Sequence, residues 1–296
     1  MADITRTSAG PFIPAIWANT ALEVLRSRIV LAKLVTRDTD VAPFQVGDTL
    51  NIPFPGTFVA NDKAANTPVT LQVPTSTTTS VVLNKHKEAS FLVEDAARAL
   101  SNQDIMKRYM EAAVVPIAEQ IESDILGLYT GFTYTTGTGG TDITAATIRS
   151  TRKLMNDNKA ETSGRVMIVS DKDEIALLGD AALANYFAFA KPDAIAQGSI
   201  GNLYGFDIYQ SQLVPFATNT KNMALTPGAI ILAMRGLPDA PAGSGAQTSV
   251  VRDPISGLTI RCVMAYNAAN LGVQVTLDVL YGVAKLRNEK AVVVLS

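Results

Sequence analysis

The sequence predicts an α+β protein whose longest helix and most of whose strands lie in different parts of the chain. Helical periodicity is strongest across 101–129, strand-type segments follow one another from 228 to 295, and helices alternate with a strand in between. A chain of 296 residues can form one large domain or two intertwined ones. Chains of this size bury about three quarters of the surface that they expose when unfolded, so a substantial core is expected.

The segment 14–35 is predicted to form one amphipathic helix, preceded by an arm without periodicity of its own. Residues 1–37 carry five Arg and Lys side chains against two acidic ones. This excess, which includes Arg26 and Arg28, indicates either a solvated helix face or a contact with an anionic partner. The apolar positions at helical spacing are Leu22, Leu25, Ile29 and Ala32.

Residues 49–84 form a long segment of low charge. Asp62 and Lys63 are its only charged residues, and prolines at 53, 55, 68 and 74 exclude the middle of a regular sheet. Thr and Val, which favour strands, are frequent in the rest. The pattern predicts a long, irregular two-stranded excursion with its tip near 60–66. Because an isolated hairpin is only marginally stable in water, the segment needs a partner surface.

The segment 101–129 carries the longest helical signal. An unbroken i, i+4 row of side chains is expected to pack against the C-terminal strands. Ser101 and Asp104 resemble a capping box at the start of the helix. Pro116 is expected to bend it, because the proline ring removes one backbone hydrogen bond and crowds the previous turn. The row consists of Ile105, Tyr109, Ala113, Ile117, Ile121 and Ile125.

The central region predicts a helix, a short buried strand and a second helix. The first helix begins near Thr144, the strand covers 165–170, and Asp171 is expected to cap the second helix. Asp171, Asp173 and Glu174 either complement the macrodipole of that helix or bind a metal ion. A hard-cation site would need further oxygen ligands at fixed spacing.

Three glycines, Gly198, Gly201 and Gly205, raise the question of a phosphate-binding loop. Such a loop lies between a strand and the N-terminus of a helix, whose amides hold the phosphate. The segment after these glycines, "FDIYQSQLVP", instead has strand chemistry and ends at Pro215. The glycines are therefore interpreted as turns that lead into a strand.

The chain has one cysteine, Cys262, and one histidine, His86. A disulfide within the chain is excluded, and a Cys/His zinc site lacks ligands. Cys262 lies on the apolar face of a predicted strand and His86 on an exposed strand edge, and neither has a local catalytic signature. We therefore expect no catalytic, cofactor-binding or metal-binding residues, and we expect both side chains to be dispensable.

The net charge of −2 does not indicate the positive charge that is typical of nucleic-acid-binding proteins. No secretory signal is visible, and no apolar stretch of about 18 residues is long enough to span a membrane. The expectation is a soluble protein that is made in the cytoplasm and has no membrane partner.

The order of these elements resembles the major capsid protein of tailed bacteriophages, which has the Hong Kong 97 type fold. "VGDTLNIPFP" is similar to the start of the family's extended loop, "SVVLNKHKEASFLVED" to the return from that loop, and "DILGLY" to the end of the spine helix. "GSIGNLYGFDIYQSQLVP" resembles a strand of the axial domain. Residues 253–295 resemble the C-terminal strands of coat proteins from short-tailed phages.

The resemblance implies five regions. An N-terminal arm and helix cover 1–46, the extended loop covers 47–85, and a peripheral domain with the spine helix covers 86–130. An axial α/β domain covers 131–255, and C-terminal strands at 256–296 return to the peripheral domain. The inserted β domain of some relatives has no room in 131–255, so its role is not carried over.

The resemblance also implies a structural subunit and not an enzyme. Such subunits form pentamers and hexamers of an icosahedral head that encloses double-stranded DNA without sequence specificity. Scaffolding, portal and decoration proteins are further possible partners, and the expected location is the virion, after synthesis in the host cytoplasm. The candidates for contacts between subunits are Arg26, Arg28, Phe54, Phe58, Asp62, Lys63, Val69 and Leu71.

Two other functions stay open. A bacterial encapsulin, which is a nanocompartment shell around an enzyme, shares the fold but not the role. The basic N-terminal arm and the C-terminal strands favour a phage protein. A small α/β enzyme built on 144–235 is a third hypothesis, although the sequence offers it no nucleophile–base pair, phosphate loop or metal cluster.

Overall fold

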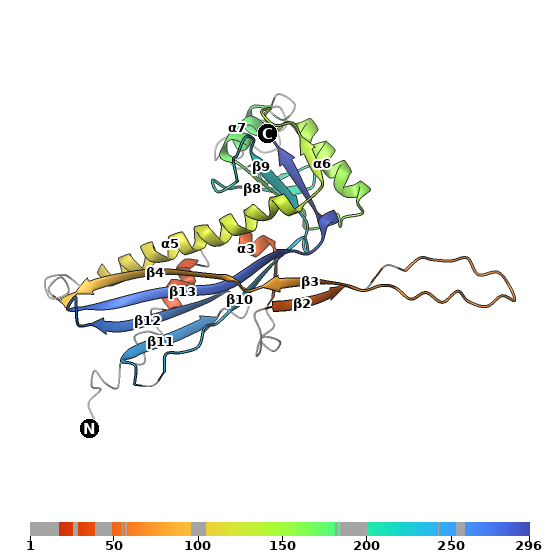
Figure 1. Cartoon of the computed structure of the whole chain (residues 1–296). Coiled ribbons are helices and arrows are strands. Elements are labelled where there is room, and N and C mark those ends of the chain that lie inside the picture. Colours follow the sequence, from red (N-terminus) through yellow and green to blue (C-terminus); the bar gives the residue numbers. More distant parts are fainter. Residues whose placement is uncertain are drawn as a thin grey trace, which may run out of the picture.

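A computed structural model describes residues 18–25, 29–38, 49–54, 56, 58–95, 105–180, 183, 200–241, 243–252 and 258–296. Figure 1 shows an elongated sheet alongside one long helix, with a second sheet and two helices at one end of it. A long loop projects from the body beside the first sheet. The described chain is thus mixed α+β, as predicted.

The first sheet has six strands in the order β1-β10-β13-β12-β11, with β4 paired to β13. Its neighbours are antiparallel except β1 and β10. β13 lies at the centre because its 14 residues pair with three other strands. The strands are β1 (Thr36–Asp38), β4 (Lys85–Glu94), β10 (Ile230–Arg235), β11 (Ala246–Arg252), β12 (Thr259–Asn267) and β13 (Gly272–Lys285).

One face of this sheet is covered by α5 (Ile105–Leu126), which ends in the 3-10 helix η2 (Gly127–Gly131). The hydroxyl of Tyr281 on β13 donates a hydrogen bond to Asp124 of α5 at 2.6 Å. Lys85 of β4 forms an ion pair with the same carboxylate at 3.0 Å. The buried side chains of α5 are mostly apolar: Met110, Val114, Ile117, Ala118, Ile121, Ile125 and Leu126.

The predicted i, i+4 row is wrong at its N-terminal end. Tyr109 is 55% exposed, whereas Ile117, Ile121 and Ile125 are buried. Steps of four residues advance about 40° beyond a full turn of a helix with 3.6 residues per turn, so a long i, i+4 row rotates off the buried face. The helix continues through Pro116, whose position is exposed. The bend expected there stays a prediction.

The predicted single helix over 14–35 is also wrong. Residues 18–25 are helical, residues 29–30 are not, and a separate short helix α3 covers Leu31–Leu34. Glu122 of α5 is buried, and its carboxylate accepts hydrogen bonds from the backbone amides of Val30 and Leu31. These amides are therefore satisfied by a side chain and not by a continuing helix. Residues 26–28 lie outside the described residues.

The second sheet has the order β5-β14-β9-β6-β8-β7. Its strands are β5 (Thr135–Gly137), β6 (Val166–Val169), β7 (Asn202–Leu203), β8 (Phe206–Gln210), β9 (Lys221–Leu225) and β14 (Ala291–Leu295), the last preceded by the 3-10 helix η3 (Asn288–Lys290). One face packs against α6 (Ala145–Asp157) and α7 (Asp171–Gly179), and the other joins the core under α5.

The ends of these two helices test the predicted caps. Thr144 caps α6 as predicted, and its side chain accepts a hydrogen bond from the Thr147 amide. The cap of α7 is Ser170 and not Asp171, because the Ser170 hydroxyl accepts from the Asp173 amide. Asp171 is the first helical residue, one position after the cap.

The glycine-rich segment forms a hairpin, which confirms the strand interpretation. Leu203 and Phe206 pair across a two-residue turn, and no helix lies between β8 and β9 in the described chain. The two turn residues, Tyr204 and Gly205, have φ of 49° and 83°. Two-residue hairpin turns with positive φ at both positions match the twist of the strands that they join.

The two sheets divide the chain differently from the expected regions. β10 and β11 fall within the predicted axial region of 131–255 but pair in the first sheet, beside β13. β14 falls within the predicted returning strands but pairs with β5 and β9 in the second sheet. The chain thus crosses between the sheets more often than an order of elements can reveal. The division into domains stays a prediction.

The placement of α5 leads to a first test. Ile121→Asp puts a charge on a fully buried side chain, and burying an unpaired charge costs several kcal/mol or more. We expect the variant to be insoluble or unfolded. Tyr109→Asp is the matched control, because that position belongs to the same i, i+4 row but is exposed. It should fold, with a thermal unfolding midpoint close to that of the wild type. Equal behaviour of both variants would contradict the helix orientation.

Candidate inter-subunit surface

The extended loop starts from a two-stranded sheet of β2 (Thr49–Phe54) and β3 (Thr77–Val82). None of the described residues between these strands is in a strand, and the segment projects from the body (Figure 1). At its tip the Thr67 amide donates to the Ala64 carbonyl at 3.4 Å, and Asn66 has a φ of 63°. The predicted excursion with a tip near 60–66 is confirmed.

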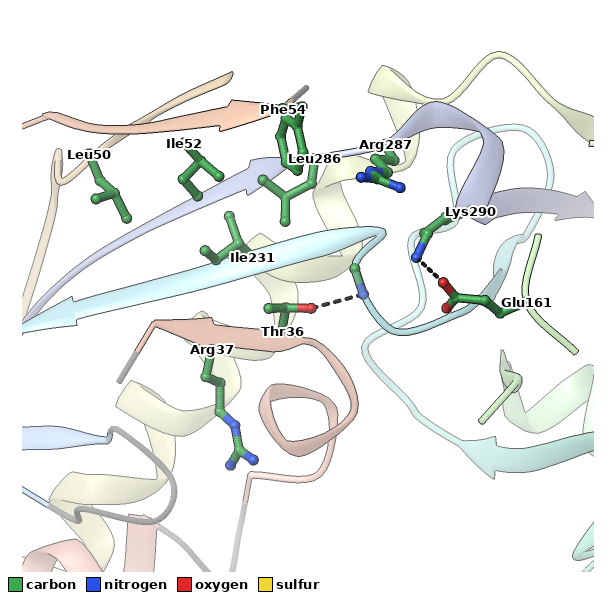
Figure 2. Close-up of a pocket in the computed structure, with 11 residues that line it drawn as sticks. Thr36, Arg37, Leu50, Ile52, Phe54, Glu161, Ile231, Leu286, Arg287 and Lys290 are labelled. Atoms are coloured by element: carbon green, nitrogen blue, oxygen red, sulfur yellow. Dashed lines mark hydrogen bonds and ion pairs between the residues drawn. The ribbon is translucent and has the colours of Figure 1, made fainter. Parts of the chain in front are cut away.

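Apolar contacts hold the base of the extended loop on the face of the first sheet opposite α5. Val81 and Leu83 are buried against Ile231 and Ala233 of β10. Figure 2 shows Leu50 and Ile52 of β2 above Ile231, with Leu286 beside them. The base of the loop therefore belongs to the core of the subunit, whereas the projecting part does not.

Gly282 of β13 allows the base of the loop to lie close to the sheet. A Cβ atom at this position would overlap the carbonyl oxygen of Val82 and crowd Leu83. The chain turns from β3 into β4 at this point, directly over β13. Only a glycine permits so close an approach of two backbones.

A groove of about 620 Å³ lies between this base and the second sheet. Its wall is apolar at Leu50, Ile52 and Ile231, and the Arg287 guanidinium lies 5.0 Å from the centre of the Phe54 ring. At the far end Lys290 forms a 2.8 Å ion pair with Glu161 (Figure 2). The hydrogen bond and the charge of Lys290 lower the pKa of Glu161. The Arg287–Phe54 contact thus joins the loop base to the segment between β13 and β14.

The projecting part of the loop, residues 58–76, exposes large apolar side chains. Phe58 is 68% exposed, Leu71 is 88% and Val73 is 95%. Side-chain contacts within the loop are few, and one of them joins the Gln72 amide to the backbone of Val59. So much exposed apolar surface on one segment is typical of a surface that another molecule covers.

The candidate contact residues divide into three groups. Phe58, Asp62, Lys63, Val69 and Leu71 all lie on the projecting part and are exposed. Phe54 lies at the loop base beside Arg287, so it holds the loop and is not at its exposed end. Arg26 and Arg28 lie outside the described residues. Sequence reasoning missed Val59 and Val73, although their apolar character in an uncharged segment was the same signal that selected Val69.

The structure separates Cys262 from His86, so the two side chains do not form a nucleophile–base pair. Cys262 pairs with Leu277 of β13, whereas His86 pairs with Leu280. Side chains three positions apart on a strand point to opposite faces, so the thiol and the imidazole lie on opposite sides of the sheet. His86 instead lies 2.9 Å from Asp278, a buried carboxylate that also binds Arg261 at 2.6 and 2.9 Å.

The acidic cluster on α7 has a structural role at Asp173. Its buried carboxylate accepts hydrogen bonds from Ser170, Asn222 and Ser296, each at 2.7 Å. Among the described residues no group of three or more His, Cys, Asp or Glu side chains is placed to hold a metal ion. In the same part of the chain no helix is both long and apolar enough to cross a membrane.

A scan against protein-family models and a search of curated proteins give no match. Solved structures do match over most of the chain. A structure from Mycobacterium phage Che8 is 20% identical, with a TM-score of 0.67 and 90% of each chain covered. The capsid of the cyanophage P-SCSP1u is 15% identical, with a TM-score of 0.65, over 90% of this chain and 88% of that one.

This chain has the Hong Kong 97 type capsid fold. A virus-like particle from Pyrococcus furiosus is also similar, at 11% identity and a TM-score of 0.54, over 95% of this chain and 98% of that one. The capsid fold thus extends from phage heads to at least one other kind of particle. The predicted fold class, and the resemblance from which it came, are confirmed.

Gly282 gives a test of the loop base in the capsid fold. Gly282→Ala should push β3 away from β13 and lower the free energy of unfolding by about 1–3 kcal/mol, the usual cost of overpacking. Gly127→Ala is the control, because a Cβ atom there would meet nothing within 4 Å. Urea unfolding measures both. A wild-type stability for Gly282→Ala would mean that the loop base is not packed as described.

Cys262 gives a test of the core. Burial, followed by the charge of Asp278, raises the pKa of its thiol to about 12, so almost no thiolate exists at pH 8. A thiol reagent should label the folded protein far more slowly than the urea-unfolded chain, in which the pKa returns to about 8.5. Fast labelling of the folded protein would place Cys262 at an accessible surface.

Proposed function

We propose that this chain is a major capsid protein of a tailed phage, a subunit that assembles with itself into an icosahedral head. One observation carries the proposal: on a capsid fold, the extended loop holds exposed apolar side chains that the isolated subunit cannot bury. Hydrophobic burial is the main favourable term in protein association. A neighbouring subunit is the partner that we propose, because every subunit of a shell lies beside other copies.

The charge pattern supports the same role. Asp62 and Lys63 are the only charges among residues 49–84, so the projecting loop meets little electrostatic resistance when it lies on another protein surface. Because the loop of each copy would contact a different patch on the next copy, the contact is head-to-tail. Head-to-tail contacts form closed rings when the rotation between copies closes. Pentamers and hexamers are such rings.

The finer parts of the proposal concern partners and location. We propose that the shell encloses double-stranded DNA without sequence specificity and is part of the virion, after synthesis in the host cytoplasm. Scaffolding, portal and decoration proteins are further partners that a head of this kind would use. The proposed role is structural and needs no enzymatic activity from this chain.

An encapsulin-type shell is the second candidate. The similarity to the Pyrococcus furiosus virus-like particle, which covers 98% of that chain, favours it, but the TM-score of 0.54 is lower than the 0.67 of the phage Che8 structure. Electron microscopy of particles from the native host separates the two. Tailed particles that hold DNA support the phage head, whereas tailless particles filled with protein support the encapsulin.

Removal of the projecting loop tests the proposed mechanism. Replacing residues 55–76 with Asn-Gly closes the hairpin at the Phe54–Thr77 pair with a favoured two-residue turn. The variant keeps the packed base, so we expect a soluble protein with a nearly unchanged circular dichroism spectrum. Sedimentation should find subunits or small rings and no closed shells. Normal shells would remove the loop from the mechanism, and an unfolded product would place it in the core.

A matched pair of double variants tests whether assembly needs the apolar side chains of the loop as well as its length. Leu71→Ser with Val73→Ser removes two exposed apolar side chains and should impair assembly without changing stability. Thr70→Ser with Thr75→Ser changes exposed polar positions of the same loop and should assemble like the wild type. Equal assembly by the two variants would show that the apolar side chains are not the contact.

A further inference from the structure

Arg165, directly before β6, is a buried cation that has no counter-charge among the described residues. Its side chain is only 3% exposed. The guanidinium donates hydrogen bonds to the backbone carbonyls of Glu161 at 2.7 Å and Ala160 at 2.9 Å, and no described carboxylate forms an ion pair with it. Burial, followed by the charge of Arg152, lowers the pKa of Arg165. A buried charge without an opposite charge is costly, and a bound anion would offset that cost.

The acidic residues that precede Arg165 in this part of the chain are already paired with lysines. The Glu161 carboxylate lies 2.8 Å from the Lys290 ammonium group (Figure 2), and the Asp157 carboxylate lies 2.7 Å from that of Lys153. The stretch 145–165 carries five basic residues against these two acidic ones. This part of the second sheet therefore has an excess of positive charge.

The side chain of Arg165 lies on the face of the second sheet that α6 covers. Met167 and Val169 of β6 belong to the core on that face, and successive side chains of a strand alternate between the two faces. By the same alternation Asp207 of β8 points to the other face, because the preceding residue Phe206 is buried in the core under α6. The nearby carboxylate of Asp207 is therefore not placed to neutralise Arg165.

Two exposed arginines of α6 lie beside the turn between β7 and β8. Arg149 and Arg152 are three positions apart, a spacing that puts both on one face of the helix. Arg152 donates to the Tyr204 carbonyl at 2.9 Å, and the Arg149 guanidinium lies 5.9 Å from the centre of the Tyr204 ring. Neither forms an ion pair with a described residue. These contacts position the two guanidinium groups without neutralising them.

We propose that Arg149, Arg152 and Arg165 form a binding site for a phosphate group. A planar guanidinium can donate two parallel hydrogen bonds to phosphate oxygens, and a bound anion would relieve the repulsion between Arg152 and Arg165. The phosphate group can come from two sources, free inorganic phosphate or the backbone of a nucleic acid. This inference goes beyond the proposed function, since it concerns the second sheet and does not require a shell.

Inorganic phosphate tests the site on the full-length protein. At constant ionic strength, replacing chloride with phosphate should raise the thermal unfolding midpoint, since a ligand that binds only the folded protein stabilises it. Arg152→Gln should weaken phosphate binding by about tenfold, the effect of losing a charge-assisted hydrogen bond. Lys153→Gln is the matched control, because it removes one charge from the next position of α6. It should stay within about twofold of the wild type, since the charge of Lys153 is already paired with Asp157.

A labelled DNA duplex of mixed sequence separates the two sources. Fluorescence anisotropy measures its affinity for the protein over a range of salt concentrations. If nucleic acid is the source, Arg152→Gln should lower the slope of log affinity against log salt by about one, whereas Lys153→Gln should not. If inorganic phosphate binds through Arg152 but the affinity for the duplex does not depend on Arg152, the site is one for free phosphate.

Arg149→Gln keeps the test decisive if Arg152→Gln does not fold. Arg152 also holds the Tyr204 carbonyl, whereas the described contact of Arg149 is with the Tyr204 ring at an exposed position. Arg149→Gln should therefore fold and bind phosphate more weakly than Lys153→Gln does. Wild-type binding by every arginine variant that folds would overturn the site, and so would an equal loss in Lys153→Gln. Either result would leave the proposed shell function untouched, because the measurements do not depend on assembly.

Discussion

The pairing of β13 with three other strands fixes the base of the extended loop on the core of the subunit. β13 has 14 residues, and it pairs with β12 over residues 272–278, with β4 over 272–281 and with β10 over 280–285. Its one face receives α5, and its other face receives the base of the extended loop where Gly282 leaves room. The strand that returns from the loop continues directly into β4. The position of the loop is therefore set by the same strand pairing that forms the core.

This arrangement separates folding from association. The buried residues of the core, such as Ile121 and Tyr281, lie in the body, whereas Leu71 and Val73 contribute exposed surface and no core contact. An isolated two-stranded excursion is marginal in water, so the loop depends on its packed base for direction and on a partner for cover. In the proposed assembly, the subunit folds first and associates afterwards, because the exposed loop surface contributes no contact to the core.

Much of this was predictable from the sequence, because local patterns determine local structure. The proline-containing segment 49–84, with only two charged residues, identified the extended loop, and the strand-forming residues after Gly205 identified β8. The predictions that were wrong depended on contacts between residues far apart in the sequence. Glu122 binds the backbone amides at the start of α3 although it lies 91 positions from Leu31 in the sequence. Tyr109 is exposed because the helix rotates an i, i+4 row away from the buried face over several turns. The assignment of β10 and β14 to different sheets has no local signature, because both read as short apolar strands.

The places where the chain departs from local rules of stability are the places where another copy is expected. The exposed apolar side chains of residues 58–76 are a liability in an isolated protein, since they favour uncontrolled association. In the proposed shell, contact with a neighbouring copy covers this surface. Natural sequences keep such violations where function requires them and satisfy the rules elsewhere. The buried Asp278 carboxylate near the middle of the sheet fits this contrast, because it accepts two hydrogen bonds from Arg261 and is satisfied within the subunit.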